Sequence, residues 1–193
     1  MHVLLAALMP LFTAPLPAPP AGDDLARAEA DVREVFGKEL VAVGRQPAAK
    51  KAALARRMIE TAAGSRPAAK YALLVQAREL AIEAADSAVG VRAVEELVGG
   101  FRPSADSGHQ TPRDAASWAS AGHRLWNAAS DQRPPEKLRT RLDAAECYLR
   151  ALPELEGFQR AAIEKRLRGL GWRPFLTPEE VVSLFRIPGA QII

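Results

Sequence analysis

Few side chains of this sequence have the types and spacing that chemistry requires, and the histidines come first. His109 falls in a polar stretch and His123 in a helical one. Neither takes part in an HExxH-like spacing, and no cluster of paired carboxylates accompanies them, as a bound zinc ion would require. The sequence therefore predicts no metal site, and we expect His123 on the surface of a helix.

The candidate nucleophiles are equally isolated. Cys147 is the only cysteine, which excludes intramolecular disulfides and metal sites built from several cysteines. It precedes Tyr148 in an apolar helical segment, with no basic group placed to lower the pKa of its thiol, so we expect a small buried hydrophobe. Ser117, Ser120 and Ser130 lie in no GxSxG context, and a nucleophile elbow needs a strand. We expect neither enzymatic activity nor a cofactor.

Charge is concentrated in residues 158–170. The basic residues of this segment, with one that follows it, are Arg160, Lys165, Arg166, Arg168 and Arg173. Glu154, Glu156 and Glu164 precede or interrupt them, so we expect a solvated helix face rather than a nucleic-acid site. The whole chain has 26 basic and 23 acidic residues, a net charge of +3, and no stripe of one sign.

The elements that would carry these residues are helices. Ala is the most abundant residue, 48% of the chain is hydrophobic, and no segment alternates apolar and polar residues as strands do. The sequence predicts an all-α fold of about seven to eight antiparallel helices, stacked as a short repeat array or an irregular bundle. The expected divisions are a half with four helices (23–100), a Pro/Gly/Ser-rich linker (101–112), a half with three helices (113–173), and a short helix with a tail (174–193).

Local signals set the expected ends and faces of the helices. Asp23 or Asp24 is expected to cap the first helix. The sixth helix should end at Pro153, and Gly157 should relieve backbone crowding before the seventh. The residues expected to face inward are Trp118, Ala121, Leu125 and Ala128 in the fifth helix, and Phe158, Ala162, Ile163, Leu167 and Leu170 in the seventh.

Residues 1–21 differ from the rest of the chain. Residues 3–14 form an apolar run interrupted by Pro10, shorter than the roughly 20 residues that span a bilayer, and with the length of the apolar region of a signal peptide. A Pro/Ala-rich stretch follows. We therefore favour export to the periplasm or envelope, with cleavage near Ala21, over a cytoplasmic protein with a disordered tail. We expect no membrane-spanning helix.

Two groups of residues share a pattern of aromatic, apolar and small side chains. They are Trp118, Ala121, Gly122 and Leu125, and Ala144, Tyr148, Ala151 and Pro153. This pattern resembles a degenerate tetratricopeptide-type repeat whose connection is about ten residues longer than usual. Residues 68–98 resemble the repeat more weakly, because they lack its Gly and its closing Pro. The resemblance implies stacked helical hairpins with a groove that binds a peptide.

Two longer segments resemble uncharacterised helical modules in exported proteins of planctomycete-type bacteria. They are residues 71–97 (YALLVQARELAIEAADSAVGVRAVEEL) and 144–167 (AAECYLRALPELEGFQRAAIEKRL). This resemblance implies export and an auxiliary or scaffolding role, and it brings no activity with it.

The tetratricopeptide-like pattern also implies where a groove would lie. The residues that it turns toward the groove are Gln76, Glu79, His123, Trp126 and Asn127. An aromatic anchor with hydrogen-bonding amides, one carboxylate and no nucleophile–base pair suits peptide binding better than catalysis. We therefore expect a non-catalytic helical-repeat protein that binds a protein or peptide segment.

Two other functions remain open on the sequence. One is a purely structural module that associates with itself through its helix faces. The other is a nucleic-acid-associated protein that uses the basic helix 158–170. For Trp126, the alternative to a groove position is burial beneath a neighbouring helix or the C-terminal segment 185–193.

Overall fold

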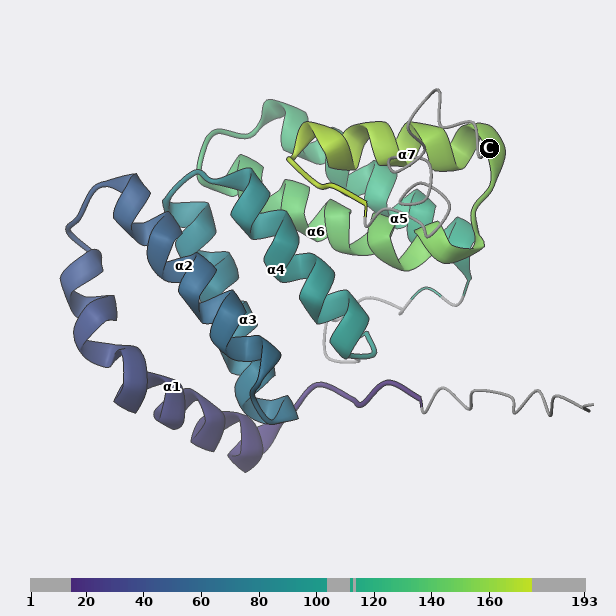
Figure 1. Ribbon diagram of the computed structural model, residues 1–193. Coiled ribbons are helices and arrows are strands. Elements are labelled where there is room, and N and C mark those ends of the chain that lie inside the picture. Colours follow the sequence, from purple (N-terminus) through teal and green to yellow (C-terminus); the bar gives the residue numbers. More distant parts are fainter. Residues whose placement is uncertain (1–14, 104–111, 113, 175–193) are drawn as a thin grey trace, which may run out of the picture.

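Seven α-helices and two short 3₁₀-helices make up the residues that the computed structural model describes, 15–103, 112 and 114–174 (Figure 1). The α-helices are α1 (Gly22–Val43), α2 (Ala48–Ala63), α3 (Pro67–Glu83), α4 (Ser87–Gly100), α5 (Ala115–Ala128), α6 (Glu136–Ala151) and α7 (Gly157–Gly169). The 3₁₀-helices η1 (Ala129–Asp131) and η2 (Leu152–Glu154) follow α5 and α6. No strand occurs in this part of the chain, which confirms the all-α prediction. The eighth helix expected after residue 177 lies outside it.

Aspartate side chains fix the starts of α4 and α5. The Asp86 carboxylate accepts a hydrogen bond from the backbone N–H of Val89 (3.1 Å), and the Asp114 carboxylate accepts one from the N–H of Ser117 (2.7 Å). These bonds satisfy N–H groups that have no partner inside the helix. The bonds from Ser117 also lower the pKa of Asp114, because they favour its charged form.

α1 begins one residue before the aspartates that were expected to cap it. Its first residue is Gly22, and Ala21 occupies the N-cap position without a side-chain hydrogen bond. Asp23 and Asp24 lie in the first turn instead, so the prediction of an aspartate cap is wrong. Their charges still interact favourably with the positive end of the helix dipole.

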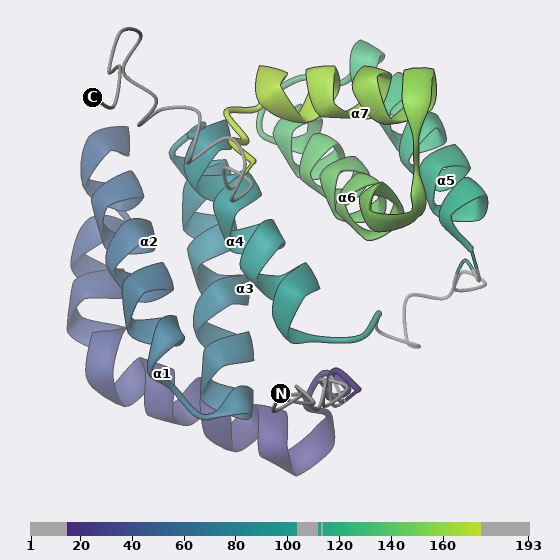
Figure 2. The ribbon, with the colours of Figure 1, turned by 45° about the vertical axis from the view of Figure 1, so that its right-hand side comes forward.

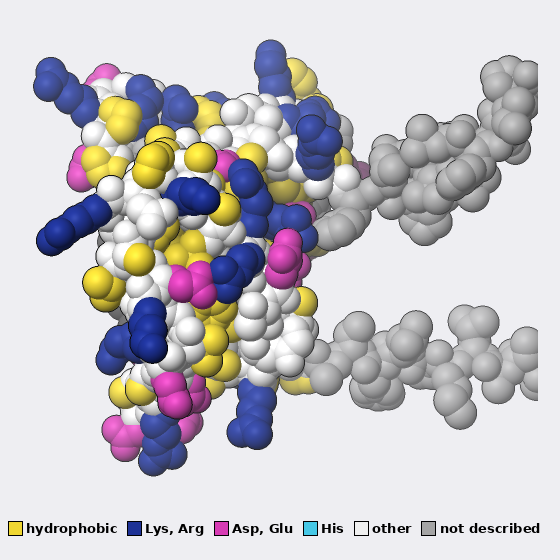
Figure 3. All heavy atoms as spheres, turned by 60° about the vertical axis from the view of Figure 1, so that its left-hand side comes forward, with side chains coloured by type: hydrophobic (Ala, Val, Ile, Leu, Met, Phe, Trp, Pro, Cys, Tyr) yellow, Lys and Arg dark blue, Asp and Glu magenta, His cyan; other side chains and the backbone are white. Residues whose placement is uncertain are grey.

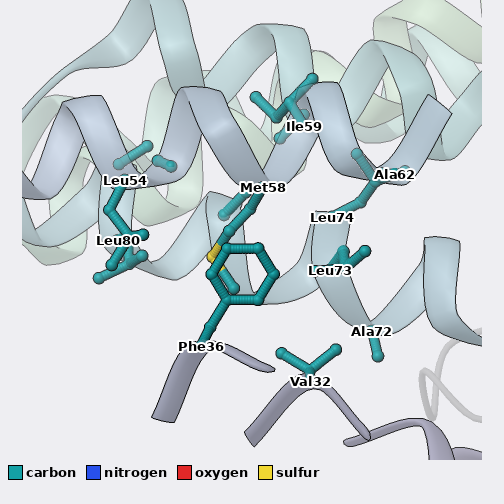
Figure 4. Close-up of a cluster of buried hydrophobic side chains, with 14 of the residues drawn as sticks. Val32, Phe36, Leu54, Met58, Ile59, Ala62, Ala72, Leu73, Leu74 and Leu80 are labelled. Carbon is teal, nitrogen blue, oxygen red and sulfur yellow. The ribbon is translucent and has the colours of Figure 1, made fainter. Parts of the chain in front are cut away.

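The first core is formed by α1, α2, α3 and one side of α4 (Figure 4). Phe36 of α1 points toward Met58 of α2, and Leu54 of α2 lies next to Leu80 of α3. Full burial of a side chain of this size contributes about 1.5–3 kcal/mol. Because α1, α2 and α4 all pack on α3, α3 is the central helix of this half.

The second core lies on the other side of α4 (Figure 2). Val91 and Val94 of α4 belong to this core, whereas Val89, Ala93 and Leu97 belong to the first. α6 lies between α4 and α5, and α7 crosses over α5 and α6. α4 therefore has two apolar faces and joins the two cores.

The predicted linker begins with a residue that lies in the core. Phe101 is 2% exposed, and its ring lies edge-on to that of Tyr71, with the centroids 5.2 Å apart. Arg150 donates a hydrogen bond to the Phe101 carbonyl (3.2 Å), and the Arg102 N–H donates one to the carbonyl of Pro17 (2.9 Å). Pro17 belongs to the predicted leader. Residues 1–14, the larger part of that leader, and most of the linker lie outside the described ranges.

The buried face of α5 differs from the predicted one. Its buried residues are Ala115, Ala119 and Gly122, whereas Trp118 and Leu125 are only partly buried. Ala121 and Ala128 were also expected to face inward. Ala121 is partly buried, and Ala128 is exposed. The prediction placed the aromatic side of the helix inward, but α5 approaches α6 closely and only its small residues fit at the contact.

α7 buries most of its predicted face, with one exception. Ile163, Leu167 and Leu170 are buried, and Ala162 is partly buried, but Phe158 is 88% exposed. The expectation for Phe158 is therefore wrong. Phe158 and Ile163 are five positions apart, and a helix turns by about 100° per residue, so their side chains point about 140° apart around α7. Phe158 therefore lies away from the buried face.

The surface mixes charges of both signs. On the face shown in Figure 3, Lys and Arg side chains are interspersed with Asp and Glu and with apolar side chains. Ion pairs such as Arg56–Asp86 (2.7 Å) and Lys51–Glu83 (2.7 Å) join different elements. None of the described helices combines the length and the apolar character needed to cross a bilayer.

The joint between α6 and α7 depends on Pro153 and Gly157, as the sequence predicts. α6 ends at Ala151, Pro153 lies in η2, and Gly157 opens α7 with a φ of +58°. A residue with a β-carbon rarely adopts a positive φ, and a β-branched residue adopts it least readily. No neighbouring atom lies within 4 Å of where a Cβ would stand at Gly157, so the requirement is one of backbone conformation alone.

We expect Gly157→Val to lower the free energy of unfolding by about 1–3 kcal/mol, because valine strains the positive φ. The matched control is Gly169→Val in the same helix, because Gly169 has no positive φ and no atom near its Cβ position. We expect its free energy of unfolding to change by no more than about 0.5 kcal/mol. Urea denaturation of both variants measures this. Equal stability of the two variants would contradict the assignment of the joint.

Candidate functional site

The candidate site is positioned by the close approach of α5 and α6. Gly122 of α5 lies against the ring of Tyr148 of α6, and a Cβ at Gly122 would stand 2.6 Å from Tyr148 Cε1 and 3.3 Å from the Ala144 carbonyl oxygen. Such distances leave no room for a side chain. The Tyr148 ring fills the space between the helices and is 0% exposed.

The hydroxyl group of Tyr148 contacts two polar side chains. It lies 2.8 Å from Nδ1 of His123 on α5, and it accepts a hydrogen bond from Nη1 of Arg166 on α7. Nη1 of Arg166 also lies 2.7 Å from Nδ1 of His123. The three side chains therefore form one network that connects α5, α6 and α7.

This network fixes the protonation state of His123. A guanidinium group has donors and no acceptor, so Nδ1 of His123 accepts from Arg166 and carries no proton. The proton of the neutral ring is then on Nε2. Partial burial, together with the positive charge of Arg166, lowers the pKa of His123 from its ordinary value of 6.5. His123 is thus a partly buried residue at the surface of α5, held by the network rather than freely solvated.

Trp126 lies one turn beyond His123 on α5 and is within cation–π distance of two arginines. The Arg141 guanidinium is 5.1 Å from the centroid of the Trp126 ring, and the Arg166 guanidinium is 5.7 Å from it. Contacts of this kind contribute about 0.5–2 kcal/mol each. Trp126 is partly buried and packs on the edge of the second core. It is neither a solvated side chain nor an enclosed core residue.

A groove of about 740 Å³ opens beside this tryptophan, and we name it the Trp126 groove. Its lining residues are Trp126, Arg141, Phe158, Ala161, Ala162, Lys165, Arg166 and Gly169. They come from α5, α6 and α7, so the crossing of α7 over the α5–α6 pair creates the groove. The volume falls within the range of about 300–1,000 Å³ that is typical of ligand sites.

The cations of the Trp126 groove differ from the others on α7. Arg160 and Arg168 both pair with Glu164, at 2.9 and 3.5 Å. Arg141, Lys165 and Arg166 take part in none of the ion pairs formed within the described ranges. The expected solvated face therefore describes only part of this helix, because Arg166 turns inward to Tyr148.

The structure brings together only some of the residues predicted to form a groove. His123 and Trp126 both contact Tyr148 and Arg166, and the neighbouring Asn127 is exposed. Gln76 and Glu79 lie on α3, are partly buried, and do not line the Trp126 groove. The Glu79 carboxylate instead pairs with Arg139 of α6 (2.7 Å).

Sequence reasoning missed three contributors to the site. Arg141 lies on α6 two turns before Tyr148, so helical spacing alone could have placed it near Trp126. Phe158 was assigned to the core, and Arg166 to a solvated face. No local signal distinguishes these two, because the crossing of α7 over α5 and α6 is a property of the tertiary fold.

A second cavity of about 420 Å³ lies where α2 and α4 meet the chain that follows α7. Charges of both signs line it: Arg56, Glu60, Arg92, Glu95, Glu96 and Arg173. The Glu95 carboxylate accepts a hydrogen bond from Nε1 of Trp172 (2.9 Å), and burial raises its pKa. Because these charges offset one another, the Trp126 groove is the better candidate for a ligand site.

Two reactive side chains near the site, Tyr148 and Cys147, are buried. Tyr148 is fully buried, so its hydroxyl does not reach the groove. Cys147 is buried as predicted, and burial raises the pKa of its thiol to about 11, so a thiol rather than a thiolate is present at neutral pH. Across the described ranges, no three His, Cys, Asp or Glu side chains gather as metal ligands.

We expect the conformational stability to fall as the pH drops below about 6.5, where the unfolded chain protonates His123 and the folded chain does not. The stability that neutral His123 contributes is present above that pH and is lost as the pH falls toward the lowered pKa. Denaturation between neutral and mildly acidic pH should show a smaller loss for His123→Gln than for the natural chain. Identical pH profiles would contradict the network.

We expect Gly122→Ala to lower the free energy of unfolding by about 1–3 kcal/mol, because the added methyl group collides with the Tyr148 ring. Gly37→Ala in α1 is the control, since nothing lies near its Cβ position and alanine favours the helix by up to about 1 kcal/mol. Thermal and urea denaturation compare the two. A neutral Gly122→Ala variant would show that α5 and α6 are farther apart.

Comparison of the chain with profiles of known protein families, with curated protein sequences and with solved structures finds no match. The geometry of the Trp126 groove and the sequence are therefore the basis for a functional proposal.

Proposed function

We propose that this chain is a non-catalytic helical protein that binds a segment of another protein in the Trp126 groove. The observation that carries the proposal is the state of Trp126, which is partly buried, lies within cation–π distance of Arg141 and Arg166, and lines the groove. Held aromatic side chains with arginine neighbours are the usual anchors of protein interfaces. A tryptophan fixed in this way loses little conformational freedom on binding.

A second aromatic residue supports the proposal. Phe158 also lines the groove and is 88% exposed, which costs hydrophobic free energy in the free protein. Ala161 and Ala162 continue the apolar wall along α7. An apolar side chain of a partner, placed between Trp126 and Phe158, would remove this surface from water.

The two other functions have less support. Val35 and Val41 are exposed on α1, at 69% and 81%. They are six positions apart, so their side chains point about 120° apart around the helix and form no common face for self-association. A nucleic-acid site along α7 would include Arg160 and Arg168, whose charges are offset by Glu164.

We further propose that the protein acts outside the cytoplasm, in the periplasm or envelope. This proposal is supported by the leader-like composition of residues 1–21 and by their resemblance in pattern to a signal peptide. Identification of the first residue of the native protein, by mass spectrometry of cell fractions, would test it.

We expect Trp126→Ala to abolish capture of the natural partner with a loss of stability below about 3 kcal/mol, because the side chain is only partly buried. Immobilised full-length protein, incubated with native cell fractions and analysed by mass spectrometry, gives the capture; thermal denaturation gives the stability. The matched control is Trp118→Ala, two turns earlier on α5, partly buried, and outside the Trp126 groove; it should keep the partner. A stability loss of about 3–5 kcal/mol in Trp126→Ala would identify a core tryptophan instead.

A further inference from the structure

We propose that the segment bound in the Trp126 groove is acidic, with carboxylates next to an aromatic or aliphatic side chain. The inference rests on the proposed function and specifies its ligand. Its basis is charge complementarity: the lining contains Arg141, Lys165 and Arg166 and no carboxylate. A site with three cations and no lining anion attracts a ligand of negative charge.

The two arginines are positioned for carboxylates before any ligand arrives. Their contacts with the Trp126 ring hold the guanidinium groups without neutralising them, because the ring supplies no negative charge. Of the hydrogen-bond donors of Arg166, Nη1 bonds to Tyr148 and His123. Arg141 has a buried Nε without a hydrogen-bond partner in the described part of the chain. Because this Nε is buried, a carboxylate in the groove would instead bind the Nη1 and Nη2 end of the guanidinium, the other two-pronged geometry.

The apolar part of the ligand follows from the first turns of α7. Phe158, Ala161 and Ala162 line the groove on the same helix as Lys165 and Arg166, and Phe158 is nearly fully exposed. A ligand with carboxylates alone would leave these apolar side chains in water. A segment with Asp or Glu beside Phe, Trp, Leu or Ile would contact both the apolar and the cationic part of the lining.

A short acidic peptide fits the surroundings better than a nucleic acid does. Glu154 and Glu156 precede α7 and are exposed, and Glu164 lies in the middle of the helix. A long polyanion that followed α7 would meet these carboxylates before it reached Lys165 and Arg166. Stacking of bases on Trp126 and Phe158 would be its main attraction, so the experiment includes it.

The test starts from a library of random dodecapeptides displayed on phage and selected on the full-length chain. We expect enrichment of Asp and Glu beside aromatic or aliphatic residues. A synthetic peptide with the enriched sequence, and a version with Gln in place of each acidic residue, would then be compared by isothermal titration calorimetry. The acidic peptide should bind at least about tenfold more tightly, and added salt should weaken it.

Variants locate the effect in the groove. Arg141→Gln should weaken binding of the acidic peptide by about tenfold or more and leave the Gln version nearly unchanged. Arg168→Gln is the matched control, because Arg168 pairs with Glu164 and does not line the groove. Circular dichroism and thermal denaturation of each variant exclude unfolding as the cause.

Each other result overturns the inference in a different way. Selected peptides without an acidic bias, whose binding still needs Trp126, would refute the charge argument and leave the proposed function standing. Peptide binding that is insensitive to Trp126→Ala would refute both. Oligothymidine that binds more tightly than the acidic peptide would assign the groove to nucleic acid. Concentration-dependent self-association that Trp126→Ala abolishes, measured by sedimentation, would assign it to a second copy of the chain.

Discussion

The contact between the Tyr148 ring and Gly122 is the constraint on which the second half of the molecule depends. It sets how closely α5 and α6 approach, and it buries the ring so completely that its hydroxyl needs partners inside the protein. His123 and Arg166 supply them. Because Arg166 belongs to α7, the same polar network holds α7 on the pair, together with the buried side chains of Ile163 and Leu167. The Trp126 groove thus lies beside the point where a buried hydroxyl group finds its partners.

The arginines link the stability of this region to its capacity for recognition. Arg166 donates a hydrogen bond to the buried Tyr148 hydroxyl and places its guanidinium over the Trp126 ring. The same side chain therefore stabilises the fold and lines the groove. Arg141 contacts the same ring from α6. Side chains that give the groove its positive charge therefore also hold α5, α6 and α7 together around Trp126.

Much of the helical architecture could be predicted from the sequence, because its signals are local. The four-residue spacing of Ala28, Val32 and Phe36 indicates one face of a helix, and all three are buried in α1. The site was less predictable. Trp126 was identified as a candidate, but Phe158 was placed in the core and Arg166 on a solvated face. These errors have one cause: periodicity gives the face of a helix, while the crossing of α7 over α5 and α6 depends on contacts distant in sequence.

The two-faced helix α4 bears on how the chain folds while it is being synthesised. Every residue of the first core lies between Ala28 and Phe101, so that core can be completed before α5 has left the ribosome. Ile82, Val91 and Val94 then stay uncovered until α6 and α7 follow, since their partners belong to the second core. For that interval the nascent protein presents an apolar strip to the chaperones of the cell. The order in which the helices are translated thus makes the first half the template on which the second half docks.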